Sequence, residues 1–121
     1  MNDQNLSDLI AMVRKFCDDR HWAQFHGPKE LAIGLTTESA ELLDLFRFKS
    51  NEECLLLLKK KGSRRQVEEE LADILYFLLR FAQLHEIDLP EAFRKKMAKN
   101  RKKYPTRLVK GKNKKYSEYK R

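Results

Sequence analysis

The chain has 121 residues, of which 41% are hydrophobic and 36% are charged, a composition typical of one small helical domain with charged outer faces. No apolar run approaches the ~20 residues that would cross a bilayer, and the sequence begins without the pattern of a secretory signal. The two cysteines, Cys17 and Cys54, are too far apart to indicate a disulfide framework or a thiolate metal site. We therefore expect a cytoplasmic protein that does not associate with membranes.

The net charge of +8 is distributed unevenly along the chain. Residues 94–121 hold fourteen Lys and Arg against one acid, a net charge of +13, so residues 1–93 carry −5. Such a basic tail attracts either a polyphosphate ligand or a nucleic acid. One alternative is therefore a nucleic-acid-binding or regulatory helical module that uses this tail. The acidic body and the lack of a DNA-reading motif argue against nucleic acid as the partner.

Five helices and no strand are predicted, and the first two flank an aromatic connection. Residues 5–19 have apolar side chains at helical spacing. The connection 20–27 is rich in aromatic residues and histidines. Pro28 then opens a second helix that runs to about Phe46, because proline is tolerated at the first helical position.

A short third helix is predicted over residues 51–60. Ser50 and Glu53 have the spacing of a capping box, which satisfies backbone N–H groups at a helix start. Gly62 follows a run of lysines and is expected to end this helix at positive φ.

A long fourth helix is predicted to begin with a second capping box, Ser63 and Gln66, and to end near Glu86. Its apolar residues spread over much more than one stripe: Val67, Leu71, Ile74, Leu75, Phe77, Leu78, Leu79, Phe81, Ala82 and Leu84. A helix that is apolar on most sides must be covered on most sides. We therefore expect a homo-oligomer, either a dimer or a tetramer built as a dimer of dimers.

The fifth helix is predicted to start at Asp88, and Pro105 bars its continuation. Beyond it, dense lysines and a glycine argue against packed structure. The expected organisation is a helical catalytic domain over 1–105 and a basic, irregular tail over 106–121.

Four acids interrupt the apolar faces of the second and fourth helices: Glu38, Glu41, Glu70 and Asp73. Burying an unpaired carboxylate is costly, so their placement is explained if the two faces meet across a divalent cation. Residues three apart on a helix have Cβ atoms about 5–6 Å apart, close enough to share an ion. An all-carboxylate set favours Mg²⁺, with Mn²⁺ as a possible substitute, over Zn²⁺. A di-iron bundle would need Glu-x-x-His motifs, and none occurs.

Several longer motifs follow one another along the chain: RHWAQFHGPK at 20–29, ESAEL at 38–42, EELADILY at 69–76, IDL at 87–89, and Lys96-x-x-x-Asn100-x-x-x-Tyr104-Pro105. Together they resemble the MazG-like all-α nucleotide pyrophosphohydrolases, and within that family the dCTP pyrophosphatase branch. The resemblance implies an all-α fold with a four-helix-bundle-like core and an extra short helix.

The resemblance also implies a reaction, the Mg²⁺-dependent hydrolysis of a nucleoside triphosphate between its α and β phosphates to give the monophosphate and pyrophosphate. The substrate would be dCTP-like or a noncanonical deoxynucleotide, removed to clean the nucleotide pool. The four acids would be catalytic residues as well as metal ligands, and one or more of them would also orient or deprotonate the attacking water.

Substrate-binding residues are implied in the same way: Trp22, Phe48 and Phe77 for the base, and Lys96, Asn100 and Tyr104 for the rest of the nucleotide. In dCTP-preferring members, Trp and Tyr stand where this chain has Phe48 and Phe77, and Asn stands where it has Glu30. The preferred base is therefore left open.

Overall fold

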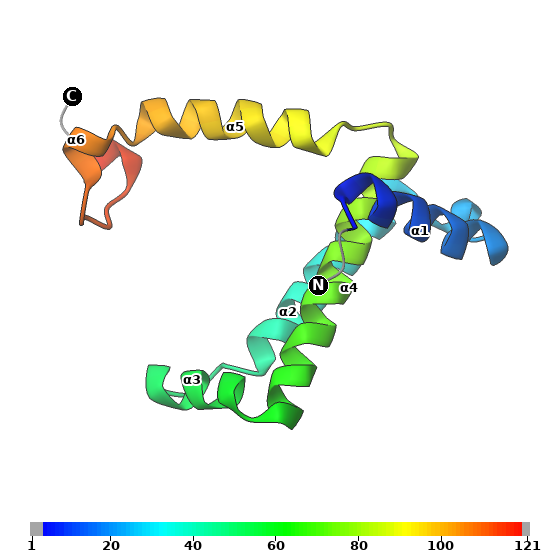
Figure 1. The fold of residues 1–121 in the computed structure, drawn as a ribbon, viewed down its shortest axis with the longest axis horizontal. Coiled ribbons are helices and arrows are strands. Elements are labelled where there is room, and N and C mark those ends of the chain that lie inside the picture. Colours follow the sequence, from blue (N-terminus) through cyan, green and yellow to red (C-terminus); the bar gives the residue numbers. More distant parts are fainter. Residues whose placement is uncertain (1–3, 120–121) are drawn as a thin grey trace. The chain divides into compact units, whose positions relative to one another are not determined.

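The protein is described here by a computed structural model that covers residues 4–119. The outermost residues of the two predicted domains, 1–3 and 120–121, lie outside the described residues. The prediction of an all-α protein is confirmed, because residues 4–119 form helices and connections without a strand. Within this part of the chain, no helix is both long enough and apolar enough to cross a membrane. The chain divides into two compact units, the first ending at Glu86 and the second beginning at Ile87; Figure 1 traces the elements of both in sequence order.

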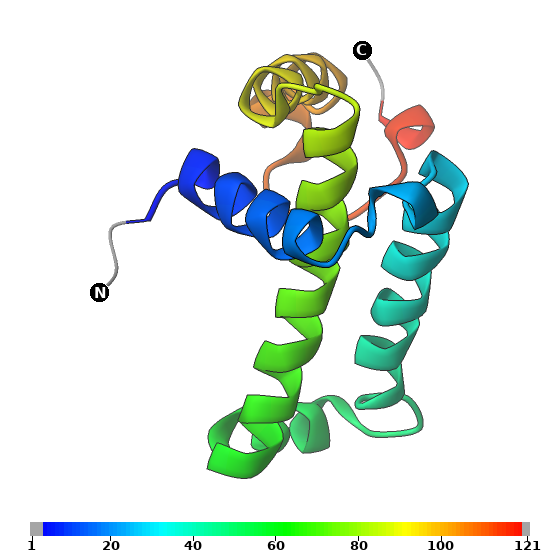
Figure 2. The same ribbon diagram turned by 90° about the vertical axis from the view of Figure 1, so that its right-hand side faces the viewer.

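The first unit is built around one long helix. Its elements are α1 (Leu6–Asp19), a short 3₁₀ turn (Ala23–Phe25), α2 (Pro28–Asp44), α3 (Asn51–Lys59) and α4 (Lys61–Leu84). Helices α1, α2 and α3 all pack against α4. Figure 2 shows α2 running beside α4, while α1 crosses the C-terminal half of α4. This arrangement lets side chains on α2 and α4 face each other along several turns.

The core of this unit is small and lies along α4, where α1, α2 and α3 pack against it. Its buried apolar residues are Val13, Cys17, Leu31, Val67, Leu79 and Ala82. Other apolar residues of α4 are left open to solvent in the single chain: Leu71, Leu75 and Leu78 remain 50%, 37% and 40% exposed. Leu75 follows Leu71 by four positions and Leu78 follows Leu75 by three, and residues at these spacings share one face of a helix. The three leucines therefore form a continuous uncovered stripe, here called the α4 leucine stripe.

Local capping signals predict several helix starts correctly. Ser50 and Glu53 form the expected capping box: the Glu53 N–H donates to Ser50 Oγ at 3.1 Å and the Ser50 N–H donates to Glu53 Oε1 at 3.1 Å. At α5, Asp88 accepts a hydrogen bond from the Glu91 N–H at 3.1 Å. These bonds satisfy N–H groups that have no partner inside the helix.

The junction between α3 and α4 differs from the prediction. Lys60, in an extended conformation, is at once the last cap of α3 and the first cap of α4. Gly62 therefore lies inside α4 and has no positive φ. The predicted capping box at Ser63 is wrong, because the Ser63 hydroxyl donates backward to the carbonyls of Leu57 and Lys60. This hydroxyl therefore satisfies carbonyl groups at the end of α3, and it accepts no hydrogen bond from an N–H group at the start of α4.

The second unit contains α5 (Leu89–Lys103), α6 (Thr106–Val109) and a 3₁₀ turn (Tyr116–Glu118). Pro105 ends α5 as predicted, yet it also caps α6, so the expectation of irregular structure after residue 106 is wrong for these segments. Tyr104 lies edge-on to Tyr116 and Tyr119, with ring centroids 6.3 Å and 6.0 Å away. These ring contacts order a segment whose lysine content suggested none, while the predicted end of a catalytic domain at residue 105 stays a prediction.

Candidate active site

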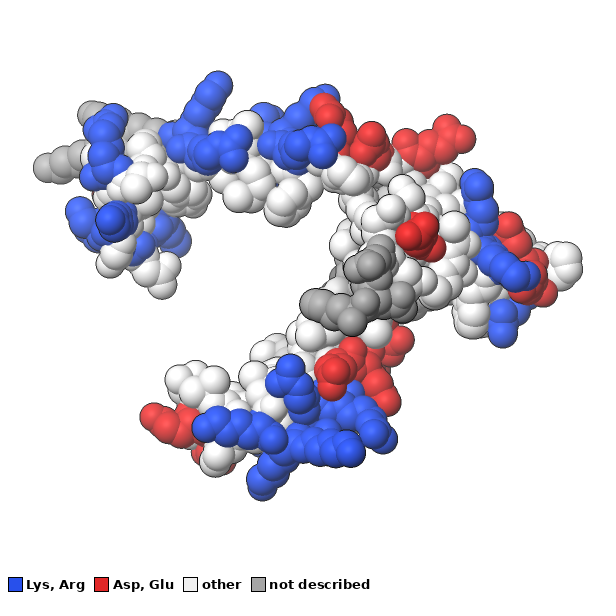
Figure 3. All heavy atoms as spheres, viewed as in Figure 1, with Lys and Arg blue, Asp and Glu red and all other residues white. Residues whose placement is uncertain are grey.

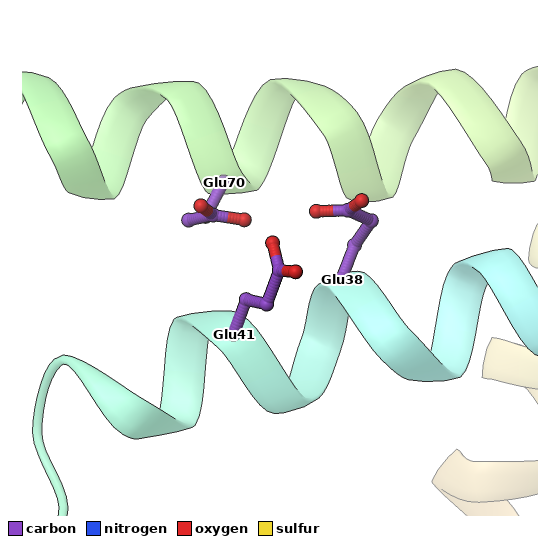
Figure 4. A group of neighbouring side chains, drawn as sticks. All are labelled: Glu38, Glu41 and Glu70. Atoms are coloured by element: carbon purple, nitrogen blue, oxygen red, sulfur yellow. The ribbon is translucent and has the colours of Figure 1, made fainter.

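Three of the four predicted acids meet between the facing sides of α2 and α4. Glu38 and Glu41 point from α2 toward Glu70 on α4 (Figure 4). One carboxylate oxygen from each lies within 4.8 Å of the others. The geometry arises because residues three apart on α2 share a face, and that face packs on α4. We call these three residues the carboxylate cluster.

The carboxylate cluster is electrostatically unfavourable without a counterion. Glu38 Oε2 and Glu70 Oε2 are buried and have no hydrogen-bond partner in the structure. Burial, reinforced by contact with Glu41 and Glu70, raises the pKa of Glu38 to about 7. Burial also raises the pKa of Glu70, with the charges of Glu41 and Asp73 adding to the effect. These two buried oxygens have no partner, and every donor in the cluster is a carboxylate oxygen. Such a set fits a divalent cation of the Mg²⁺ or Mn²⁺ type.

Asp73 lies beside the carboxylate cluster but is not part of it. It is exposed on α4, one turn beyond Glu70, and with Glu38 it lines an open pocket. Its charge contributes to the raised pKa of Glu38. Asp73 therefore lies at the pocket and outside the carboxylate cluster, and its role as a metal ligand stays a prediction.

The pocket beside the carboxylate cluster has a volume of about 320 Å³. Its lining residues come from α1, the following connection, α2 and α4: Phe16, Trp22, Glu38, Asp73, Tyr76 and Phe77. This size is near the lower end of small-molecule sites, which start at about 300 Å³. Two predicted base-binding residues, Trp22 and Phe77, are thus brought together with two of the predicted acids.

The aromatic side of the pocket is a connected set of rings. Phe16 lies edge-on to both Trp22 and Tyr76, with centroid distances of 5.6 Å and 6.0 Å. Tyr76 in turn lies edge-on to Phe77 at 5.0 Å. Such edge-to-face pairs hold rings in defined orientations. Phe16 and Tyr76 were not predicted as site residues, because their helical spacing is equally typical of core positions.

Sequence reasoning also missed a buried pair that holds the connection 20–27 to α4. Arg80 is completely buried, and its Nε donates to His26 Nδ1 at 3.0 Å. The His26 ring lies edge-on to Trp22 with centroids 6.1 Å apart. Burial, and then the nearby Arg80 charge, lower the pKa of His26, which keeps the imidazole neutral and able to accept. A lone arginine within the apolar run of α4 was the available signal for this pair.

Phe48 is not brought to the pocket. It follows α2 with a φ of 64°, an unusual backbone conformation for a bulky residue. Its side chain is 91% exposed and lies under the guanidinium of Arg47, 4.4 Å from the ring centroid. A role for Phe48 in substrate binding stays a prediction.

The three remaining predicted residues belong to the second unit. Lys96 is exposed on α5, and Asn100, one turn later on the same face, lies with its amide nitrogen 3.9 Å from Met97 Sδ. Tyr104 caps the end of α5 and joins the tyrosine contacts described above. Basic side chains gather along α5 and α6 and, in the first unit, over the α3–α4 junction (Figure 3). Nucleotide binding by Lys96, Asn100 and Tyr104 stays a prediction.

Comparison with known proteins gives a consistent result. The model of the MazG-like family matches residues 33–119, a range that includes all four acids. The chain is 36% identical to dCTP pyrophosphatase 1 of Bos taurus over 117 residues, covering 97% of this chain and 69% of the relative. It is 34% identical to the Homo sapiens protein of the same name, covering 96% of this chain and 68% of that one. The crystal structure of a pyrophosphatase from Archaeoglobus fulgidus superposes with a TM-score of 0.76 at 39% identity, over 87% of this chain and 96% of that one. Sequence, fold and the acids on α2 and α4 thus agree, and the chain belongs to the MazG-like family.

Proposed function

We propose that this protein is a Mg²⁺-dependent nucleoside triphosphate pyrophosphohydrolase that cleaves dCTP or a related noncanonical deoxynucleotide to the monophosphate and pyrophosphate. The reaction class, hydrolysis of a nucleotide pyrophosphate bond, is that of its relatives, which are dCTP pyrophosphatases and a pyrophosphatase. The observation that carries the proposal is the carboxylate cluster at the edge of an aromatic pocket. Cation ligands and a base-sized slot lie side by side there.

The carboxylate cluster would hold the metal through Glu38, Glu41 and Glu70. When bound, Mg²⁺ neutralises phosphate charge and lowers the pKa of coordinated water. Glu38 belongs to both the cluster and the pocket, so a nucleotide whose base enters the pocket brings its phosphates toward the acids. Asp73 is exposed and lines the same pocket as Glu38, and its carboxylate would accept a hydrogen bond from the attacking water and so orient it.

The aromatic rings would select the base by stacking and by shape. Trp22, Tyr76 and Phe77 line the slot, and flat apolar rings stack on any base. Phe77 offers no hydrogen-bond donor, so it discriminates by size and contact alone. A base-modified nucleotide that still fits the slot is therefore expected to be a substrate along with dCTP.

The α4 leucine stripe supports the proposal of a homo-oligomer, a dimer or a tetramer. Its leucines are 37–50% exposed in the single chain, and a continuous apolar stripe of this kind is typical of a helix covered by a partner. Leu75→Glu should give a smaller species in analytical ultracentrifugation, whereas Lys59→Glu, at an exposed polar position of α3, should not. An unchanged mass for Leu75→Glu would exclude this stripe as the subunit contact.

We also propose that the protein acts in the cytoplasm. Cys17 and Cys54 are free thiols, which persist in a reducing compartment. Fractionation of cells that express the chain with a terminal tag tests this directly, and recovery of the protein from an oxidising compartment would contradict it.

The central experiment is a product analysis with dCTP. Incubation with Mg²⁺ should release dCMP and pyrophosphate, and EDTA should stop the reaction until Mg²⁺ or Mn²⁺ is restored. Glu41→Gln and Asp73→Asn should abolish turnover while circular dichroism still shows a helical protein. Glu68→Gln makes the same kind of change at an exposed position of α4 outside the site and should remain active. Release of dCDP and phosphate, or full activity in EDTA, would contradict the proposal.

A further inference from the structure

Phe77 packs against α2 at a position where α2 has no side chain. If Gly34 carried a Cβ atom, that atom would lie 2.6 Å from Phe77 Cδ1 and Cζ, and closer still to Cε1. Real Cβ atoms do not approach another carbon so closely. The ring of Phe77 therefore occupies the space that any other residue at position 34 would fill.

This contact lies one helical turn from the acids. Gly34 precedes Glu38 by four residues on α2, so these two residues share a face of that helix. Phe77 follows Asp73 by four residues on α4 and shares a face with it in the same way. Phe77, Glu38 and Asp73 line the same pocket. The position of the Phe77 ring thus sets the shape of that pocket on its α2 side.

We propose that Gly34 determines substrate specificity: its missing side chain lets the Phe77 ring lie against the α2 backbone, which keeps the pocket open to a base. The inference rests on the proposed function, in which this pocket receives the base of a nucleoside triphosphate. Gly34 does not itself touch the reacting atoms, so it acts as a positioning residue through Phe77.

An added methyl group at position 34 can be accommodated in two ways, either by rotation of the ring or by separation of α2 from α4. Rotating one side chain away from its preferred conformation disturbs only the contacts of that side chain. Moving the helices apart disturbs the packing along both of them, which is the costlier change. Ring rotation is therefore the expected response.

The pocket offers open space into which the ring can rotate. Tyr76 stands edge-on to Phe77 with centroids 5.0 Å apart, and an added Cβ at position 34 occupies the α2 side. The pocket, which Phe77 itself lines, has a volume of about 320 Å³. A benzyl ring that swings into a pocket of this size narrows the slot for a base without moving the carboxylate cluster.

The test is a comparison of Gly34→Ala with Gly62→Ala. Both place alanine at a helical glycine and so remove the same backbone freedom, but nothing lies within 4 Å of a Cβ at position 62. With dCTP and Mg²⁺, we expect Gly34→Ala to raise KM about tenfold or more with kcat changed less than about threefold, the pattern of lost substrate binding. The decrease in kcat/KM should be larger for dATP than for dCTP, because a purine is the larger base. Gly62→Ala should match the unchanged protein.

A second variant separates ring displacement from a general disturbance. Phe77→Leu removes Cε1 and Cζ, two of the three ring atoms that the new Cβ would meet, and leaves a smaller side chain that can turn aside. Adding Gly34→Ala to Phe77→Leu should therefore change KM less than about twofold, a non-additive result for residues in contact. Calorimetric titration with dCMP should show the same pattern in affinity, independently of turnover.

Three outcomes would overturn the inference. The first is that KM and dCMP affinity are unchanged in Gly34→Ala. The second is that Gly34→Ala raises KM as much on the Phe77→Leu background as in the unchanged protein. The third is that the half-saturating Mg²⁺ concentration rises in Gly34→Ala while dCMP affinity stays constant. The last result would mean that the helices separated and the ring stayed. If the unchanged protein cleaves no nucleoside triphosphate, the proposed function fails and the inference fails with it. Turnover by the unchanged protein together with one of the three outcomes removes the inference alone.

Discussion

Replacing Glu38 by Gln is expected to stabilise the metal-free protein, although the residue is a candidate for catalysis. The pKa of Glu38 is raised from 4.5 to about 7, mainly by burial and then by its carboxylate neighbours. Between these two pH values the folded protein holds a proton that the unfolded chain releases. Stability therefore falls as pH rises from 4.5 to about 7 and stays low above it. A neutral glutamine removes this penalty.

The size of the gain follows from two independent routes. The pKa change corresponds to about 3–4 kcal/mol at about 1.4 kcal/mol per pH unit, and this is an upper value because water screens a half-buried side chain. Two like charges 4.8 Å apart, the separation limit within the carboxylate cluster, repel by about 1 kcal/mol in water and about 3 kcal/mol at an effective dielectric constant of about 20. We expect a gain of about 1–2 kcal/mol at pH 8.

The assay is urea unfolding in EDTA at pH 5 and pH 8, with Glu68→Gln as the matched control. Glu38→Gln should gain stability at pH 8 and little at pH 5, and the control should change little at either pH. Excess Mg²⁺ should stabilise the unchanged protein more than Glu38→Gln, because the variant lacks a ligand. A Glu38→Gln variant that is destabilised equally at both pH values would refute the reasoning, since it would mean that the carboxylate has a favourable partner in the metal-free fold.

Three further measurements probe other parts of the first unit. The half-saturating Mg²⁺ concentration should rise as pH falls below about 7, because Glu38 must lose its proton to bind a cation; a half-saturating concentration that stays constant down to pH 5 would contradict this. Arg80→Met should raise the pKa of His26 part of the way toward 6.5, since the charge is removed while the burial remains. An NMR titration that finds the His26 pKa unchanged would exclude Arg80 as a cause. Ser50→Ala should cost about 1 kcal/mol in thermal unfolding through loss of the α3 cap, and an unaltered melting temperature would show that the cap contributes nothing.

Features encoded over a few residues were predictable from the sequence. The Ser50 capping box and the end of α5 at Pro105 depend on neighbours within four positions. The spacing of Glu38 and Glu41 likewise predicts a shared face, because helical periodicity is local. The prediction that this face meets Glu70 required the further premise that partnerless acids are grouped around a cation.

Features that depend on distant segments were not predictable. Arg80 and His26 are 54 positions apart, and no local rule pairs them. Ser63 has a helix-start pattern, but the carbonyls at the end of α3 compete for its hydroxyl and accept its hydrogen bond. The segment after Pro105 has the composition of an unstructured tail, yet tyrosines more than ten positions apart bring it into contact with the end of α5. In each case a tertiary contact outweighs the local preference.

The pocket draws its walls from separate stretches of chain. Phe16 and Trp22 precede residue 33, where the family match begins, whereas the acids at 38 and 73 follow it. Changes confined to the first helix and its aromatic connection can therefore reshape one wall of the pocket without replacing any of the four acids. Part of what the enzyme accepts can thus diverge separately from the acids, so a small helical scaffold of this type is well suited to acquire new nucleotide targets.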